Sequence, residues 1–438
     1  MTPARFPRLQ TASLAILVLA VVLMGRVRDY TLSDPQLTLL TSQVLWERHT
    51  IDLRPELDRL GPKEFAKDTW KYSINSRGQV FYGYPLGTSL IALPVVALGR
   101  TLGSDLAVWD TDRRYQIALA GLCSAAVFFL LAEISWRFHP EPMSVIFAFV
   151  VTLGSSLVST LGSALWSFDL ELVFALLAFR EVARAESAVG ESPRAFRLGL
   201  FLAVAWICRP SAATLALPVG LFMLARGWRG LLSFGAGILV VILPFLAFCR
   251  VVTGSYFASY YAAGHWIRVS DLANWPANLE AILLSPARGL FVFTPALVFG
   301  VIALALPGVR RRPAARVLFG WVSLTIALVA TQRNWWGGWS FGPRLLTEVV
   351  PGLALLTLMG WTAVTLNTQR RLIGIVALCL GWGVLVHTGQ GLYFRAAYAW
   401  NNRPNIDAAS EYYRHNWSFP QFLATAARND AKAEAHGR

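Results

Sequence analysis

The sequence predicts an all-α polytopic membrane protein with about 11 transmembrane helices. Hydrophobic residues make up 55% of the 438 residues and charged residues 15%, and the mean hydropathy is +0.50. These values lie well outside the usual makeup of soluble domains. Apolar runs long enough to cross a hydrocarbon core of roughly 30 Å recur from Leu14 to Leu392. We therefore expect residues 1–392 to form one transmembrane module and residues 393–438 to form a short tail.

The distribution of positive charge predicts the orientation of the helices. The formal net charge is +14, but the basic residues are scattered in short loops between apolar runs. This pattern follows the positive-inside rule of membrane proteins, so a nucleic-acid partner is not expected. The loops expected to be cytoplasmic are Arg180–Arg197, Arg226 with Arg229, Arg310–Arg312 with Arg316, and Arg370 with Arg371. The N-terminus is then cytoplasmic, and the tail after Tyr393 is extracytoplasmic.

The basic loops also delimit the crossing segments. These are Phe168–Phe179, Leu198–Ile207, Ser211–Ala225, Leu231–Phe248, Gly289–Leu306, Val317–Thr331, Leu345–Val364 and Leu372–Leu392. The two segments on either side of Arg209 are short for spanning helices. Between Tyr84 and Trp166 there are three apolar runs, whereas the flanking topology requires an even number of crossings. We expect one of these runs to be re-entrant or wrongly placed.

The first apolar run ends at Met24 without a small-x-small cleavage site, which indicates a retained helix. This helix delivers residues 26–83 to the extracytoplasmic side as one long polar loop. Within the loop, Pro35–Arg48 has apolar residues at helical spacing and is expected to form a helix on the membrane surface. The last residues, Asn429–Arg438, are expected to be disordered.

Three arginines share one setting at the extracytoplasmic ends of predicted helices. Arg209, Arg288 and Arg344 each lie close to a proline suited to a first helical turn. A cation there faces the positive end of the helix dipole, which is unfavourable by about 0.3 to 1 kcal/mol unless an anion offsets it. A phosphate group would do so, because helix N-termini and arginine both bind phosphate. The alternative is that each arginine reaches toward lipid headgroups.

Two acids are candidates for chemistry on the same side. Asp34 is the extracytoplasmic acid nearest the end of the first helix and could take the proton from an acceptor hydroxyl. The alternative is that Asp34 and Pro35 form the cap and first turn of the helix that follows. Asp169 opens an inward-running helix and is equally explained as a cap or as a functional acid at a membrane boundary.

Aromatic residues surround these positions, and no metal site is predicted. Trp335, Trp336 and Trp339 could stack on a sugar or form an interfacial belt. His265 is a possible substrate contact, but no partner has metal-ligand spacing. The four cysteines lie in or at the edge of apolar runs without a CxxC pair, so neither a disulfide framework nor a cysteine metal site is expected.

Several motifs, in this order, resemble the GT-C superfamily of membrane glycosyltransferases. The similarity is greatest to the bacterial branch related to protein O-mannosyltransferases and lipid A aminoarabinose transferases, and it covers most of the chain. The motifs are Ser33-Asp34 to Asp52-Leu53, Gly83-Tyr84-Pro85-Leu86-Gly87, Arg209-Pro210, Ser285-Pro286-Ala287-Arg288-Gly289-Leu290-Phe291, Gly337-Gly338-Trp339-Ser340-Phe341-Gly342-Pro343-Arg344 and Trp417-Ser418-Phe419-Pro420-Gln421-Phe422.

The resemblance implies a GT-C-like fold and an activity. Asp34 would be the catalytic base, and Arg209, Arg288 and Arg344 would bind the phosphate of a polyprenyl-phosphate sugar. Transfer to an acceptor hydroxyl would invert the anomeric carbon, and preorganised arginines can stabilise the departing phosphate without a metal. Further possible substrate contacts are Asp169, His265, Trp336, Trp339 and Tyr84. The implied location is the bacterial inner membrane, and the acceptor is a glycan, a lipid or a protein.

Two other functions also fit a membrane protein with an extracytoplasmic phosphate site. A transporter or flippase of lipid-linked saccharides would need polar residues along a path at mid-membrane, but Leu231–Phe248 and Leu345–Val364 are almost wholly apolar. A ligase or polymerase of lipid-linked oligosaccharides would carry a large extracytoplasmic loop with His and Arg, and the loop Val251–Arg288 is only moderate in size.

Overall fold

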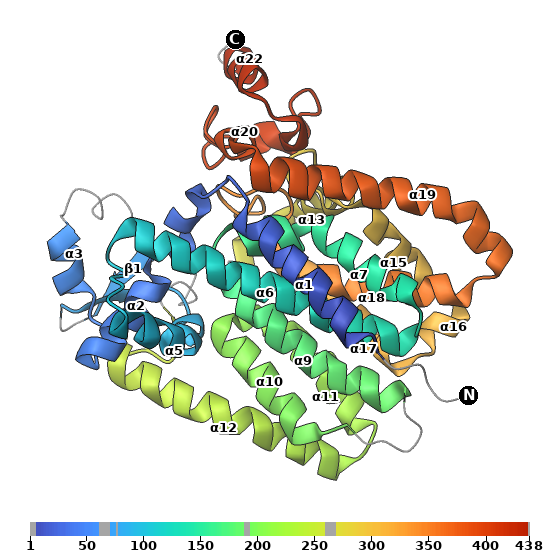
Figure 1. The fold of residues 1–438 in the computed structure, drawn as a ribbon, viewed down its shortest axis with the longest axis horizontal. Helices are drawn as coiled ribbons and strands as arrows, with labels where there is room; N and C mark the ends of the chain where they lie inside the picture. Colours follow the sequence, from blue (N-terminus) through green and yellow to red (C-terminus); the bar gives the residue numbers. More distant parts are fainter. Residues whose placement is uncertain (1–5, 61–70, 76–77, 188–192, 259–268, 437–438) are drawn as a thin grey trace.

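The computed structural model describes residues 6–60, 71–75, 78–187, 193–258 and 269–436 (Figure 1). Within these ranges the chain is helical apart from one small sheet, in which β1 (Tyr72–Ile74) pairs antiparallel with β2 (Val80–Tyr82). The prediction of an all-helical architecture is thus confirmed for the described residues. The sheet lies in the loop after the first helix.

The described residues contain five helices long and apolar enough to cross a membrane. They are α6 (Trp109–Phe138), α12 (Trp228–Thr253), α17 (Pro313–Ala330), η9 with α18 (Arg344–Val349, Val350–Ala363) and α19 with the π-helical η10 (Leu366–Val384, Leu385–Tyr393). The shorter apolar helices are α1 (Arg8–Leu23), α5 (Gly87–Thr101), α10 (Ala195–Cys208) and η5 with α11 (Pro210–Ala212, Ala213–Leu224). By length and composition the protein is a membrane protein, and a total of about 11 crossings would require the shorter helices to cross as well.

A broken helix lies among the three apolar runs between Tyr84 and Trp166. There α7 (Pro142–Leu153) is followed by α8 (Ser156–Ser159) and η4 (Leu161–Ser163), and the two parts are bent by 56°. The other two runs form the continuous helices α5 and α6. The third run is therefore the one with the geometry of a broken span or a re-entrant loop.

The segment Gly289–Leu306 is not the single crossing helix that we predicted. It forms three short pieces, α14 (Leu290–Phe293), η8 (Pro295–Leu297) and α15 (Val298–Ala303). The break falls at Thr294, which has φ −133° and ψ 70°, because the following Pro295 disfavours helical geometry at the preceding residue.

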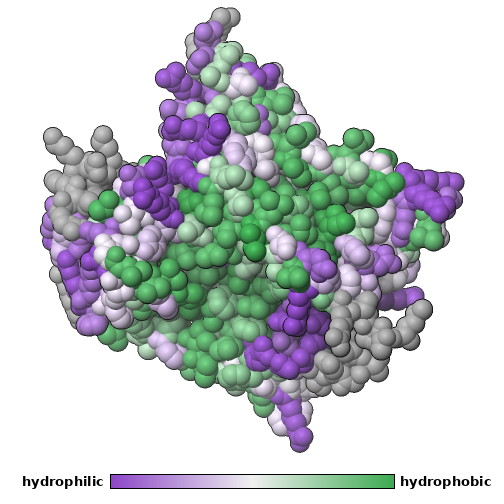
Figure 2. Space-filling model, in the orientation of Figure 1, coloured by the Kyte–Doolittle hydropathy of each residue, from purple (hydrophilic) through white to green (hydrophobic). Residues whose placement is uncertain are grey.

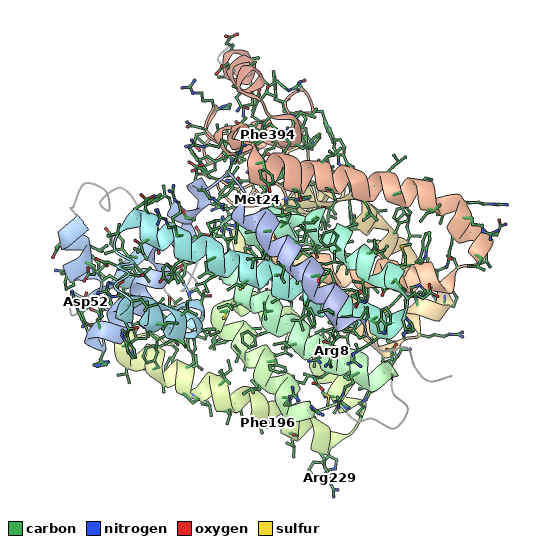
Figure 3. All side chains as sticks on the ribbon, in the orientation of Figure 1. Arg8, Met24, Asp52, Phe196, Arg229 and Phe394 are labelled. Carbon is green, nitrogen blue, oxygen red and sulfur yellow. The ribbon has the colours of Figure 1, made fainter. Side chains whose placement is uncertain are left out.

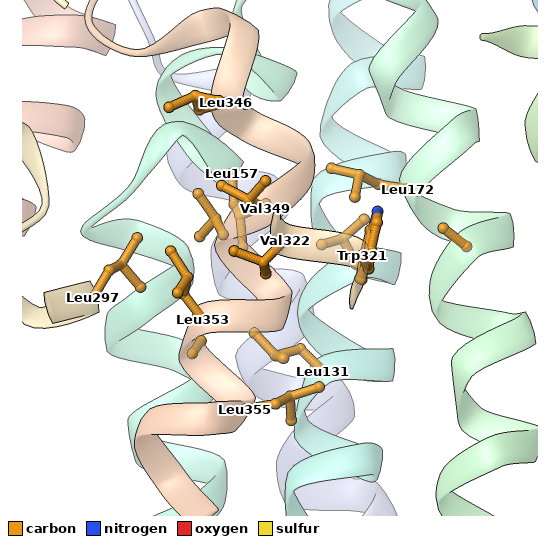
Figure 4. Close-up of a cluster of buried hydrophobic side chains, with 14 of the residues drawn as sticks. Leu131, Leu157, Leu172, Leu297, Trp321, Val322, Leu346, Val349, Leu353 and Leu355 are labelled. Atoms are coloured by element: carbon orange, nitrogen blue, oxygen red, sulfur yellow. The ribbon is translucent and has the colours of Figure 1, made fainter. Parts of the chain in front are cut away.

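The centre of the helical bundle is α18. Every residue from Val350 to Gly360 is buried, as expected for a helix that is apolar on all sides. Figure 4 shows Val349, Leu353 and Leu355 of the η9–α18 segment among side chains of neighbouring helices, including Leu131 of α6 and Val322 of α17. This packing anchors the helix whose first residue is Arg344.

The outermost helices keep apolar surfaces exposed. In α12 only Phe234, Gly237 and Cys249 are buried, and the face in Figure 2 is broadly hydrophobic between polar ends. The inner side of α12 packs very closely on α10, since a Cβ on Gly237 would lie 2.1 Å from the carbonyl oxygen of Phe196. Small residues at helix crossings are typical of membrane bundles.

The two ends of the first helix lie in opposite parts of the molecule (Figure 3). Figure 3 places Arg8 and Arg229 in the lower half of the view, away from Met24 and Phe394. At the opposite end the backbone N–H of Arg26 donates to the carbonyl of Leu392, 2.9 Å away. The end of the first helix, the loop after it and the start of the C-terminal tail therefore lie together.

The segment expected to form a helix on the membrane surface is helical, but it is buried inside the protein. η2 (Asp34–Leu37) leads into α2 (Thr38–Arg48), and Thr38–Val44 are all buried. The Ser42 hydroxyl donates to the carbonyl of Ser89 in α5 at 2.7 Å, so α2 packs on α5 with polar as well as apolar residues. A helix held on a membrane by one apolar stripe would leave its polar residues exposed.

The tail is ordered where disorder was expected. Its elements are α20 (Arg395–Ala399), α21 (Ser410–Arg414), η11 (Gln421–Leu423) and α22 (Ala426–His436), and they project beyond α19 (Figure 1). Lys432 of α22 is completely buried, with its ammonium group 4.2 Å from the ring centre of Trp400. Its polar composition predicts disorder, but Lys432 packs on the indole and Asn429 donates to Ala396 O at 3.0 Å, so contacts with the rest of the tail position the helix.

Candidate functional site

A cavity of about 600 Å³ lies where the first loop, the loop before η9 and the tail meet. The first loop contributes η1 (Asp29–Leu32), the start of η2, Lys71 and Tyr84. The other walls are lined by Gln332, Asn334, Gly337, Gly338, Trp339, Arg344, Leu345, Tyr398 and Asp407. Segments separated by some 300 residues thus form one polar chamber beside the end of the first helix.

Asp34 and Arg344 form an ion pair in this cavity. The Nη2 atom of Arg344 donates to Oδ2 of Asp34, and Nη1 donates to the carbonyl of Gly337 at 3.2 Å. The guanidinium group also lies 3.9 Å from the ring centre of Trp166. Its Nε atom is buried and has no hydrogen-bond partner among the described residues. Arg344 is thus held in place by the protein while keeping a donor unused.

The carboxylate of Asp34 does not serve as a helix cap. η2 has no side-chain capping hydrogen bond, and Asp34 lies in its first turn with Pro35. The backbone carbonyl of Asp34 instead accepts a hydrogen bond from the Tyr82 hydroxyl at 2.7 Å. Because β2 fixes the backbone here, the side chain is free to point at Arg344, and 21% of its surface remains exposed.

The loop before Arg344 owes its shape to Gly337 and Gly338. Both residues have φ of +68°, the left-handed region that side chains disfavour. This turn presents its two carbonyl groups to two different arginines, since Gly337 accepts from Arg344 and Gly338 accepts from Arg288 at 3.2 Å. The Gly-Gly pair of the sequence motif therefore positions both cations.

Lys71 adds a second cation that the sequence did not single out. Its Nζ atom donates to the carbonyl of Leu32 and to Oε1 of Gln36, each at 2.6 Å. Asp29 on the rim is paired with Arg395 at 2.9 Å. The cavity therefore holds carboxylates and cations in close balance, and an incoming anion must compete with Asp34 for Arg344.

Arg288 lies beside the cavity but its guanidinium is fully engaged by the protein. Nε donates to Trp336 O at 2.6 Å, Nη1 to Ala287 O and Gln421 Oε1, and Nη2 to Gly338 O and Asn401 Oδ1. These five acceptors match the five N–H groups of a guanidinium. Burial lowers the pKa of Arg288 to about 10, so the group stays charged at neutral pH. Arg288 ties the loop at the cavity to the tail.

Arg209 is placed apart from the lining of the cavity. Its Nε atom pairs with the buried carboxylate of Glu348, and Nη1 donates to Ser167 Oγ at 3.1 Å. The guanidinium also lies 3.7 Å from the ring centre of Phe168. The structure thus brings Arg344 to Asp34 but does not gather three arginines around one open site.

The other predicted contacts fall into three groups. Trp339 and Tyr84 line the cavity. Trp336 is buried behind the loop, where its Nε1 donates to Asp407 Oδ1 at 2.7 Å, and Asp169 is completely buried in the first turn of α9 (Ser167–Ser187). His265 lies outside the described residues.

Gln421 is a positioning residue that the sequence reasoning missed. Its Nε2 donates to Ser340 O at 2.8 Å and Ala397 O at 3.0 Å, and its Oε1 accepts from Arg288 and from Gly342 N at 2.9 Å. Gln421 lies inside the tail motif Trp417–Phe422. That motif was the available signal, and the structure shows that it fastens the tail to the loop before Arg344.

An apolar crevice adjoins the polar cavity through a shared residue. Tyr84 lines both, and the crevice is otherwise lined by apolar and aromatic side chains of β2, α10 and α12, including Phe81, Trp206, Phe245 and Phe257. The outer surface of α12 is exposed and apolar. Tyr84 therefore separates the polar chamber from an apolar part of the protein that faces α12.

The site thus combines three carboxylates, two cations and aromatic walls. Among the described residues, no group of three or more His, Cys, Asp or Glu side chains is arranged to hold a metal ion. Comparison of the chain with protein-family models, with curated proteins and with solved structures finds no match. The function is therefore argued from the geometry of the site.

Proposed function

We propose that this chain is a membrane glycosyltransferase that moves a sugar from a polyprenyl-phosphate donor to an acceptor hydroxyl. The single observation that carries this proposal is the pairing of Asp34 with Arg344 inside a polar cavity of about 600 Å³. A carboxylate and an arginine that both line the cavity provide a base and a phosphate ligand at one place.

The donor phosphate would replace Asp34 as the partner of Arg344. Charge-assisted contacts between arginine and phosphate are strong and often bidentate, and Nη2 of Arg344 donates to Asp34 inside the cavity. Lys71, which lines the same cavity, supplies further positive charge. The carboxylate of Asp34, no longer paired with Arg344, then acts as the base. Binding of the donor phosphate therefore makes the base available.

The transfer itself is a displacement at the anomeric carbon. The acceptor oxygen forms the new bond to that carbon while its proton passes to Asp34, and the bond from the carbon to the phosphate oxygen breaks. The polyprenyl phosphate leaves with the bonding electron pair, and Arg344 stabilises its added negative charge. One displacement inverts the anomeric configuration.

The walls of the site support a lipid-linked sugar as the donor. Trp339 and Tyr398 line the cavity with ring centres 5.9 Å apart, which gives a sugar ring apolar faces to lie against. The apolar side chains around Tyr84 and the exposed apolar face of α12 would lie beside the lipid chain next to the phosphate position. A soluble nucleotide sugar would need no such surface.

The remaining parts of the proposal concern topology and location. If the four shorter apolar helices, the bent pair and α9 cross together with the five long helices, the chain makes 11 crossings, with the N-terminus cytoplasmic and the cavity extracytoplasmic. The basic loops represented by Arg8 and Arg229 lie at the opposite end of the view from Met24 and Phe394 (Figure 3). The proposed location is the bacterial inner membrane.

The test is an assay of the purified protein with labelled polyprenyl-phosphate mannose, glucose and aminoarabinose and a cell-envelope extract as acceptor pool. We expect wild type to release polyprenyl phosphate from at least one donor and Asp34→Asn to lose release by about a hundredfold or more, as for loss of a general base. The matched control is Asp110→Asn, because Asp110 is an exposed acid paired with Arg113 at 2.8 Å on the start of α6.

Two outcomes would contradict the proposal. Transfer by Asp34→Asn at the wild-type rate would remove Asp34 from the mechanism. Movement of an intact labelled donor across a liposome bilayer, without cleavage of the sugar–phosphate bond, would favour a flippase instead.

A further inference from the structure

A second polar cavity, of about 420 Å³, lies on the other side of the loop that carries Trp336. It is formed by the start of α13 (Trp275–Leu284), by residues 333–336 and by α21 with the segment before it. Its lining consists of Asn274, Ala277, Asn278, Arg333, Trp335, Trp336, Asp407, Ser410, Glu411 and Arg414. This volume falls within the range of roughly 300–1,000 Å³ found for small-molecule sites.

Arg414 is a buried cation with unused donors in this cavity. The residue is 7% exposed, and its guanidinium lies 5.2 Å from the ring centre of Trp335. Nη2 donates to Glu411 Oε1 at 2.8 Å and to Asn278 Oδ1 at 3.4 Å. Nε has no partner among the described residues, and the same holds for the buried Nε1 of Trp335. Both orphaned atoms are buried donors, so a ligand in the cavity would meet the other polar groups of its lining, among them Asn278 and Glu411.

The charges around the cavity favour a neutral ligand over an anion. Two cations, Arg333 and Arg414, face two carboxylates, Asp407 and Glu411, so an added negative charge would gain little net attraction. The amide, carboxylate and guanidinium side chains of this cavity can donate hydrogen bonds to, and accept them from, adjacent hydroxyl groups of a ligand. The indoles beside them offer an apolar face. That combination recognises a saccharide through its hydroxyl groups.

The second cavity adjoins the first through one residue pair. Asp407 lines both cavities, and its carboxylate accepts the hydrogen bond from Nε1 of Trp336, which lines only the second. A saccharide in the second cavity would therefore contact Asp407, which also lines the cavity of Asp34 and Arg344. A chain of two or more sugar rings could extend a terminal hydroxyl past Asp407.

We propose that this second cavity binds the acceptor, and that the acceptor is a neutral glycan. Its role as an acceptor site rests on the proposed glycosyltransferase function, whereas the binding of a glycan does not. A glycan acceptor distinguishes this chain from transferases that modify a protein side chain or a lipid headgroup.

The test measures binding of a glycan array to the purified, detergent-solubilised protein without donor. The array carries neutral oligosaccharides of mannose, glucose, galactose and N-acetylglucosamine together with uronic-acid and sugar-phosphate oligosaccharides. Wild type should bind at least one neutral glycan. Arg414→Met should weaken that binding about tenfold or more, since hydrogen bonds to a charged group are lost. Arg333→Ala, which removes an exposed side chain, should weaken it about threefold without any effect on folding.

The controls separate this inference from the proposed function. Arg316→Ala removes an exposed arginine of α17 at the predicted cytoplasmic end and should leave glycan binding unchanged. Loss of transfer activity together with intact, Arg414-dependent glycan binding would overturn the transferase proposal and keep the site.

Three results would overturn the site itself. They are no binding of any glycan by wild type, binding of acidic glycans only, and neutral-glycan binding that is unchanged in both Arg414→Met and Arg333→Ala.

Discussion

Arg288 and Arg344 lie on either side of one loop, yet their surroundings differ in one decisive respect. All five N–H groups of Arg288 are taken by protein acceptors, whereas Arg344 shares its guanidinium between Gly337 and the acid Asp34 and keeps Nε unused. An arginine whose N–H groups all donate to the protein stabilises the fold. An arginine that shares its N–H groups with a carboxylate in a cavity can exchange that partner for a ligand. Residue type and sequence setting do not distinguish the two, but their hydrogen-bond partners do.

The largest expected effect is on stability, at Arg288. Arg288→Met would remove five hydrogen bonds of a buried guanidinium and should lower the free energy of unfolding by at least about 3 kcal/mol. Arg344→Met should lower it by less, because it removes fewer hydrogen bonds and leaves Asp34 with 21% of its side chain exposed to solvent. Thermal unfolding in detergent measures both, and equal shifts for the two variants would erase the contrast between them.

The next effect concerns the buried pair of Arg209 and Glu348. Glu348→Gln leaves the guanidinium of Arg209 without its carboxylate in a buried setting and should cost about 3–5 kcal/mol. The fraction of Glu348→Gln protein that still folds should bind donor with the affinity of wild type. If Glu348→Gln instead folds normally and binds donor more weakly, Arg209 belongs to the phosphate site. Its position apart from the cavity lining would then not reflect its role.

A pH-dependent effect is expected where Lys432 docks on the tail. Burial, and secondarily the charge of Arg288, lowers the pKa of Lys432 to about 7 from its ordinary value of 10.5. Unfolding therefore takes up a proton between these values, so stability should rise with pH from about 7 toward 10.5 and be independent of this group below about 7. Lys432→Met should flatten that rise in melting temperature, and an unchanged profile would show that Lys432 does not titrate there.

The smallest effect is expected at an aromatic wall of the first cavity. Trp339→Ala removes one face available to the sugar and should raise the KM for donor by about threefold to tenfold, in keeping with an aromatic contact of about 0.5–1.5 kcal/mol. Trp339→Phe keeps the ring and loses only the bond to Asn405, which is 3.2 Å long and exposed. The Phe variant should therefore stay close to wild type, and equal losses in the two variants would argue against stacking.

The helical membrane architecture could be predicted from the sequence, because a long apolar run in a bilayer satisfies its backbone hydrogen bonds by forming a helix. The sequence also placed Asp34 and Arg344 at helix beginnings, where the structure has them. It could not identify the partners of Arg288 and Arg209, because Gln421 and Glu348 lie 133 and 139 residues away in the chain. The order of α22 was missed for a related reason, since it depends on Trp400 rather than on the composition of its own residues.

The central claim is that donor phosphate takes the place of Asp34 on Arg344, and the most direct measurement is the affinity of the purified protein for polyprenyl phosphate. If the two compete, Asp34→Asn should bind polyprenyl phosphate more tightly than wild type, by about twofold to fivefold for a partly exposed pair, while Arg344→Met binds more weakly. Weaker binding by Asp34→Asn, or unchanged binding by Arg344→Met, would contradict the exchange and with it the proposed site.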